Sequence, residues 1–145
     1  MTVARETVLN ALLAYLGTAG AFATQSRRLI PPEKITPAMS PALFLFQESE
    51  MHDSAIPNLP AIGRFHVLAA LYNNAGTDEN VIPETALNVA LDGIDAAFKI
   101  SDANDGFVTL GGVVYSIRRN GESKFLSGAL TGCAGCIVPI QIIAP

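Results

Sequence analysis

The sequence predicts an α+β fold: a mixed, mostly antiparallel sheet with two helices packed on one face and long loops projecting from a β-hairpin. Two segments carry apolar residues at helical spacing, and the runs between and after them are rich in the β-branched and aromatic residues typical of strands. The order is therefore helix, strands, helix, strands, which is typical of the α+β class. We expect one domain over residues 1–145, because a chain of about 150 residues can bury a core of its own.

The first predicted helix runs from Val3 to Leu16. Its leucines recur every three or four positions, and Gly17 and Gly20 are expected to end it. The stretch FATQSRRLI (22–30) could form a short strand, which leads into PPEKITPAMSP (31–41). Four of the nine prolines lie there. Because proline lacks an amide donor, we expect an extended loop without a regular ladder.

A hairpin is predicted next. ALFLFQES (42–49) and GRFHVLAALYNN (63–74) are apolar runs typical of strands, and the irregular stretch EMHDSAIPNLP separates them. Connections of this length are uncommon in a compact domain unless they serve a function or are disordered. The sequence therefore predicts two strands joined by a projecting finger.

The second predicted helix begins at Pro83, which suits a first helical position, after the turn sequence AGTDEN. Its apolar stripe is spaced at three and four residues and consists of Leu87, Ala90, Leu91, Ile94 and Phe98. The last predicted strands are FVTLGGVVYSIRR (107–119), with a bulge or break at Gly111-Gly112, and CIVPIQIIAP (136–145).

Composition limits the class of function. Half of the residues are apolar and only 15% are charged, against about 25% in an average soluble domain. We therefore expect other subunits to cover part of the apolar surface. A net charge of −4 argues against nucleic-acid binding as the main function. The first 20 residues do not match a signal peptide, and no apolar run is long enough for a membrane span, so we expect the cysteines to stay reduced.

Cys133 and Cys136 form a C-x-x-C pair. A redox pair needs a lowered thiol pKa, usually from a following helix, but the next residues, IVPIQII, are typical of a strand. A zinc site needs four ligands, and only His52 and His66 add to the two cysteines. Small packing residues are the favoured interpretation, with a redox or metal site as the alternative.

Other candidate chemistry is sparse. His66 lies within a strand and is expected to be a core or cross-strand residue, while His52 beside Asp53 could form an acid–base pair or belong to a solvated loop. The pairs Arg27-Arg28 and Arg118-Arg119 are explained by a solvated face or by salt bridges between subunits. We expect no enzyme, and no catalytic, cofactor-binding or metal-binding residues.

Several segments together resemble the tail terminator (tail completion) proteins of long-tailed bacteriophages. They are RETVLNALLAYL with ATQSRRL, SPALFLFQ with the loop into RFHVLAALYNN, PETALNVALDGIDAAF, and TLGGVVYSIRRNG with the final GCIVPIQIIAP. The likeness spans nearly the whole chain and depends on the order and spacing of the segments. The C-x-x-C pair departs from the family pattern, so the resemblance gives the cysteines no function.

The resemblance implies a structural virion protein without catalytic residues. Such proteins form a homo-oligomeric ring, hexameric in relatives, that caps the tail tube, ends its polymerisation and joins the tail to a head connector or head-closure protein. The ring lies at the tail–neck junction of the virion after assembly in the host cytoplasm. DNA only passes through its lumen, which the acidic balance suits, and no membrane is involved. Another neck or tail component, such as a head-closure or tube subunit, is the alternative, followed by a small C-x-x-C redox or metal protein.

We expect the contacts to involve the loops at 27–40 and 49–62. Their apolar side chains should be poorly buried in a lone subunit, and their charges are candidates for contacts with the tube or neck. The candidate interface residues are Arg27, Arg28, Leu29, Ile35, Met39, Glu48, Glu50, Met51, Asp53, Ile56 and Leu59.

Overall fold

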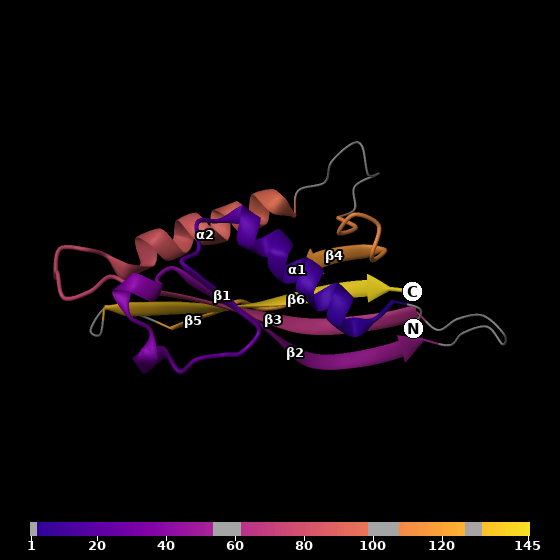
Figure 1. The fold of residues 1–145 in the computed structure, drawn as a ribbon. Coiled ribbons are helices and arrows are strands. Elements are labelled where there is room, and N and C mark those ends of the chain that lie inside the picture. Colours follow the sequence, from indigo (N-terminus) through magenta and orange to yellow (C-terminus); the bar gives the residue numbers. More distant parts are fainter. Residues whose placement is uncertain (1–2, 54–61, 99–107, 127–131) are drawn as a thin grey trace.

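The computed structural model describes residues 3–53, 62–98, 108–126 and 132–145. Two helices, α1 (Arg5–Ala19) and α2 (Pro83–Ala97), cover one face of a six-stranded open sheet (Figure 1). The strands are β1 (Thr24–Ser26), β2 (Ala42–Asp53), β3 (Ile62–Asn74), β4 (Ser116–Arg119), β5 (Lys124–Leu126) and β6 (Cys133–Ala144). The predicted α+β class is confirmed.

The sheet has the order β1-β2-β3-β6-β4, with β5 also paired to β6. Among the described strands, β1 and β2 pair in parallel and every other pair is antiparallel. The long strands β2, β3 and β6 form the centre, and the ladder of β2 with β3 shifts register between Gln47 and Ser49. This shift is a bulge, which increases the local twist of the strand.

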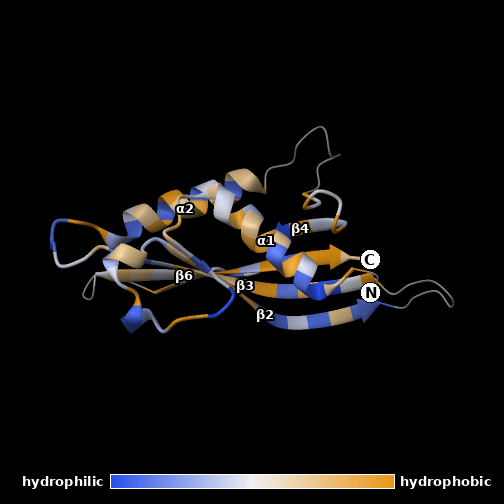
Figure 2. Cartoon of the chain, in the orientation of Figure 1, coloured by the Kyte–Doolittle hydropathy of each residue, from blue (hydrophilic) through white to orange (hydrophobic). Residues whose placement is uncertain are grey.

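The main core lies between the helices and the sheet. Leu12 and Leu16 of α1 and Leu87 and Ile94 of α2 are fully buried there. Figure 2 shows β3 and β6 coloured mainly as hydrophobic, whereas the far end of β2 is mainly hydrophilic. Since alternate residues of a strand point to opposite faces, β6 also supplies a second cluster on the other side of the sheet.

That second cluster is covered by the proline-rich segment (residues 27–41), which holds the short 3-10 helices η1 (Pro32–Lys34) and η2 (Pro37–Met39). In Figure 1 this segment lies on the opposite side of the sheet from α1 and α2, at one end. The buried members of the second cluster are Ile35, Ala42, Phe44, Ala70, Tyr72 and Cys133. One face of the sheet is thus covered by helices, and the other is covered at one end by the proline-rich segment.

Several predicted boundaries were wrong. The strand predicted over 107–119 is confined to β4, with one bridge between Val108 and Ile117 before it. Leu110, Gly111 and Gly112 have positive φ angles of 52°, 71° and 91°, and a chain in that conformation turns and cannot continue a strand. The predicted break at the two glycines is therefore the correct alternative.

The remaining differences from the prediction concern where individual strands and the first helix begin or end. The strand predicted over 22–30 shrinks to β1, and β2 continues to Asp53, so the hairpin loop begins later than expected. The last strand begins at Cys133 and not at Cys136. The first helix continues through Gly17 and ends before Gly20, so only the second of the two predicted glycines ends it.

Candidate interaction surfaces

The proline-rich segment is anchored to its own subunit by apolar side chains. Ile35 is only 2% exposed and Met39 packs against the same cluster, next to Phe44 and Tyr72. The prediction that Ile35 is poorly buried in a lone subunit is therefore wrong, because the far face of the sheet receives it. Leu29, 42% exposed, remains available on the surface.

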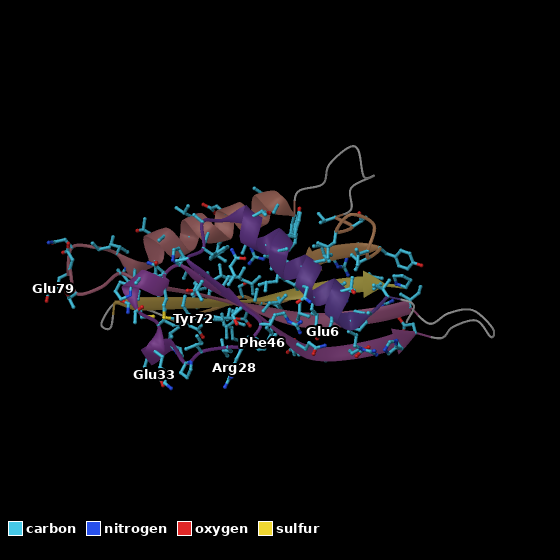
Figure 3. All side chains as sticks on the ribbon, in the orientation of Figure 1. Glu6, Arg28, Glu33, Phe46, Tyr72 and Glu79 are labelled. Atoms are coloured by element: carbon cyan, nitrogen blue, oxygen red, sulfur yellow. The ribbon has the colours of Figure 1, made fainter. Side chains whose placement is uncertain are left out.

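The two neighbouring arginines of this segment have different surroundings. Arg27 Nη1 donates to Glu6 Oε2 at 2.7 Å and to Asn10 Oδ1 at 3.4 Å, so it ties the segment to α1. Arg28 is exposed, and its backbone amide donates to Ser26 Oγ at 3.0 Å. In Figure 3 the side chains of Arg28 and Glu33 project outward, away from the sheet. Of the two arginines, Arg28 is thus the one left exposed on the surface.

The four candidates between residues 48 and 53 lie on β2 and not in a loop. Glu48 is exposed at the bulge, and Met51 is 59% exposed. Glu50 accepts hydrogen bonds from Arg5, and Asp53 Oδ2 lies 2.9 Å from Arg64 Nε. The two other candidates, Ile56 and Leu59, lie outside the described residues.

Glu50 is the centre of a small charged group. Arg5 Nη2 lies 2.6 Å from Glu50 Oε1, and His52 Nε2 lies 2.7 Å from the same oxygen. The hydrogen bond from Arg5 is the largest cause that lowers the pKa of Glu50 below its usual value, with His52 acting in the same direction. His52 therefore faces Glu50, and Asp53, its proposed acid–base partner, faces Arg64.

The two cysteines lie on opposite faces of β6. Cys133 belongs to the cluster under the proline-rich segment, whereas Cys136 belongs to the core under the helices. Burial is the main cause that raises the pKa of both thiols, the opposite of what a reactive thiolate needs. The geometry places them as packing residues and keeps their sulfur atoms from one shared site.

The remaining polar candidates are held within the subunit. Arg119 pairs with Asp95 of α2, and Arg118 Nε donates to Gln141 Oε1 at 2.9 Å. His66 is half-buried opposite Gln141, in the cross-strand position expected of it. Within the described ranges, no group of three or more His, Cys, Asp or Glu side chains could hold a metal ion.

Exposed apolar side chains identify further surfaces that the sequence patterns did not reveal. Phe125 and Leu126 of β5 are 61% and 50% exposed, in a stretch between the last two predicted strands for which no element was predicted. Val89 on α2 and Ile82 just before it are 67% and 64% exposed. The sequence Lys124-Phe125-Leu126 was the available signal for β5, but three residues are too few to show the alternation of a strand.

No family model matches this chain, and a search of curated proteins finds no match. Among the described residues, no helix is long and apolar enough to cross a membrane.

Proposed function

We propose that this chain is a structural subunit of a phage tail terminator, which forms a ring, caps the tail tube and joins it to the head connector. The resemblance of its segments, in order and spacing, is the origin of this proposal. The observation that carries it furthest is the placement of large exposed apolar side chains on both outer edges of one sheet, at Met51 on β2 and at Phe125 and Leu126 on β5.

Two separate edges suit a ring subunit. In a ring each copy offers one surface to the copy before it and a different surface to the copy after it, a heterologous contact. The helices and the sheet share one closely packed core, which gives the rigid body that such a ring needs. The proline-rich segment, with Arg28 and Leu29 exposed, is a third surface, available to the tube or the connector.

The test uses both the purified protein and the assembled phage. Light scattering after size exclusion, with negative-stain images, should show closed rings of uniform size. Phage lacking the protein should make tubes of irregular length or tails that do not join heads. An open filament of the purified protein would instead indicate a tube subunit. Tails of normal length, joined to heads in its absence, would refute the terminator function.

A further inference from the structure

The sheet ends in two edges with unpaired backbone. β1 pairs with β2 only at Ala42, Leu43 and Phe44, so the rest of β2, residues 45–53, has no strand beside its outer edge in the described part of the chain. At the other side β6 is the one strand of the described residues that pairs with β5. Part of β4 is covered by Val108, whose carbonyl accepts the Ile117 amide, so β5 offers the more open backbone of the two.

Both edges carry apolar side chains that an isolated edge strand usually avoids. Met51 is 59% exposed on β2, and Phe125 and Leu126 are 61% and 50% exposed on β5. Exposed edge strands with large apolar residues tend to pair with another chain. These side chains would lose contact with water if the two edges met.

The charges of the edges are opposite. The unpaired part of β2 contains Glu48, Glu50 and Asp53; Arg5 and Arg64 form ion pairs with Glu50 and Asp53, so this edge keeps one acidic charge in excess. The other edge contains Arg118, Arg119 and Lys124; Arg119 pairs with Asp95 and Glu122 lies between the strands, so this edge keeps one basic charge in excess. Two acidic edges repel one another, as do two basic edges, whereas an acidic and a basic edge attract. Charge therefore favours a head-to-tail contact over a symmetric one.

We infer that the free edge of β2 in one subunit pairs with β5 of the next subunit, so that the sheet continues around the ring. This inference rests on the proposed ring and names the surfaces that build it. β2 and β6 both run antiparallel to β3, and β5 runs antiparallel to β6. If two neighbouring copies have the same orientation, β5 of one copy therefore runs antiparallel to β2 of the other, and the two strands can pair as an antiparallel ladder.

The register of the strands adds a stagger. β5 pairs with residues 135–137 of β6, which are level with 70–72 of β3 and 42–44 of β2. That part of β2 is already paired with β1. The incoming β5 must therefore shift along the strand direction to lie beyond β1, and a sheet that closes on itself requires such a stagger.

Cysteine cross-linking tests this contact. Met51 and Leu126 lie on the same face of the sheet. Across the strands, Met51 is level with Arg64 and Ile143, and Leu126 is level with Gly135. Ile143 and Gly135 are an even number of residues apart on β6, so they point to the same face. An equal mixture of Met51→Cys and Leu126→Cys proteins, treated with a short bismaleimide, should give covalent dimers. Each variant alone should give none, since a head-to-tail contact brings residue 51 only to residue 126.

Val89→Cys on α2, mixed with Leu126→Cys, is the matched control, since Val89 is 67% exposed but lies on neither edge. It should not cross-link. Dimers from Met51→Cys alone would indicate symmetric pairing and overturn the inference. Rings in which the mixture gives no covalent dimer would also overturn the inference, but they would leave the terminator function standing. A protein that stays monomeric at every concentration would overturn the inference as well.

A charge exchange gives a second, independent measurement. Asp53→Lys or Lys124→Glu alone should weaken self-association by about tenfold in sedimentation, because an antiparallel pair that sets residue 51 beside residue 126 also sets residue 53 beside residue 124, and each change places like charges there. The chain with both substitutions should regain association, since its charges are opposite again. Neither side chain is buried, so neither change disturbs the core. If the loss of self-association in the double variant equals the sum of the losses in the two single variants, the pairing is contradicted.

Discussion

Arg5, at the start of α1, holds Glu50 of β2 with three hydrogen-bond contacts: its Nε lies 2.9 Å and 3.0 Å from the two carboxylate oxygens, and its Nη2 lies 2.6 Å from Oε1. This two-pronged geometry joins the first helix to the part of β2 that extends beyond β1. A guanidinium and a carboxylate in this arrangement make stronger hydrogen bonds than a lysine would. The contact therefore fixes the orientation of α1 relative to this end of β2.

The Arg5–Glu50 contact should make stability depend on pH. The pKa of Glu50 is lowered in the folded state, so its contribution is present above the unfolded value and is lost as pH falls through the folded pKa. Glu50→Gln should lower the thermal midpoint by no more than about 2 °C at pH 7, because the pair is partly exposed and screened. The difference from the native protein should vanish in strong acid. A gap that grows on acidification would contradict this account.

Gly93 should resist replacement by alanine, although alanine is usually the better helix former. A Cβ on Gly93 would clash with the backbone carbonyl oxygen of Ala19, where α1 ends against α2. Gly93→Ala should therefore lower the free energy of unfolding by about 1–3 kcal/mol, typical of overpacking, instead of raising it by up to about 1 kcal/mol. Asn88→Ala, at an exposed position of the same helix, is the control and should have little effect. A stabilised Gly93→Ala protein would show that the helices can shift apart.

The cysteines should be replaceable by alanine but less easily by serine. Both thiols are buried, so Cys136→Ser places a hydroxyl in the core under the helices, which costs about 1–3 kcal/mol if it finds no partner. The Cys133→Ala, Cys136→Ala variant should still form rings and support phage growth. In the native protein both thiols should react slowly with a thiol reagent at pH 8, because their pKa values are raised and they are buried. Fast reaction of the folded protein, or loss of rings in the alanine variant, would give the pair a function.

The helices and the central strands could be predicted because their patterns are long. The stripe from Leu87 to Ile94 repeats over two turns, and the structure places both residues in the core. Ile35 could not be placed, because nothing local in a proline-rich stretch indicates that the far face of the sheet is open to receive it. β5 was missed for a similar reason: it is three residues long, and its pairing with β6 is a property of the whole sheet.

For the candidate surface, too, the sequence predicts some features and folding decides others. The sequence indicates that Glu50 and Asp53 are charged, but their partners Arg5 and Arg64 come from α1 and β3, brought near by folding. Arg27 and Arg28 are identical in local sequence terms, yet Glu6 and Asn10 hold only the first. Which charges remain available to a partner is therefore decided by the tertiary structure.

Arg28 should act in capping without contributing to the stability of the subunit. Its side chain is exposed and projects away from the sheet (Figure 3), whereas Arg27 is hydrogen-bonded to Glu6 of α1. Arg28→Glu should leave the thermal midpoint and the ring size unchanged, because a solvated charge contributes little to folding. It should weaken attachment to the tube or connector, since reversal of a charge at a contact places like charges together.

The matched change Arg27→Glu separates capping from folding. It places a carboxylate beside Glu6, loses the tie between the proline-rich segment and α1, and should lower the thermal midpoint. In phage carrying Arg28→Glu, we expect tubes of irregular length or tails without heads, measured by electron microscopy, while the purified rings remain intact. Tails of normal length joined to heads in the Arg28→Glu phage would exclude this arginine from the contact. Loss of the ring in that variant would instead place Arg28 between subunits, in the role now assigned to the β2 and β5 edges.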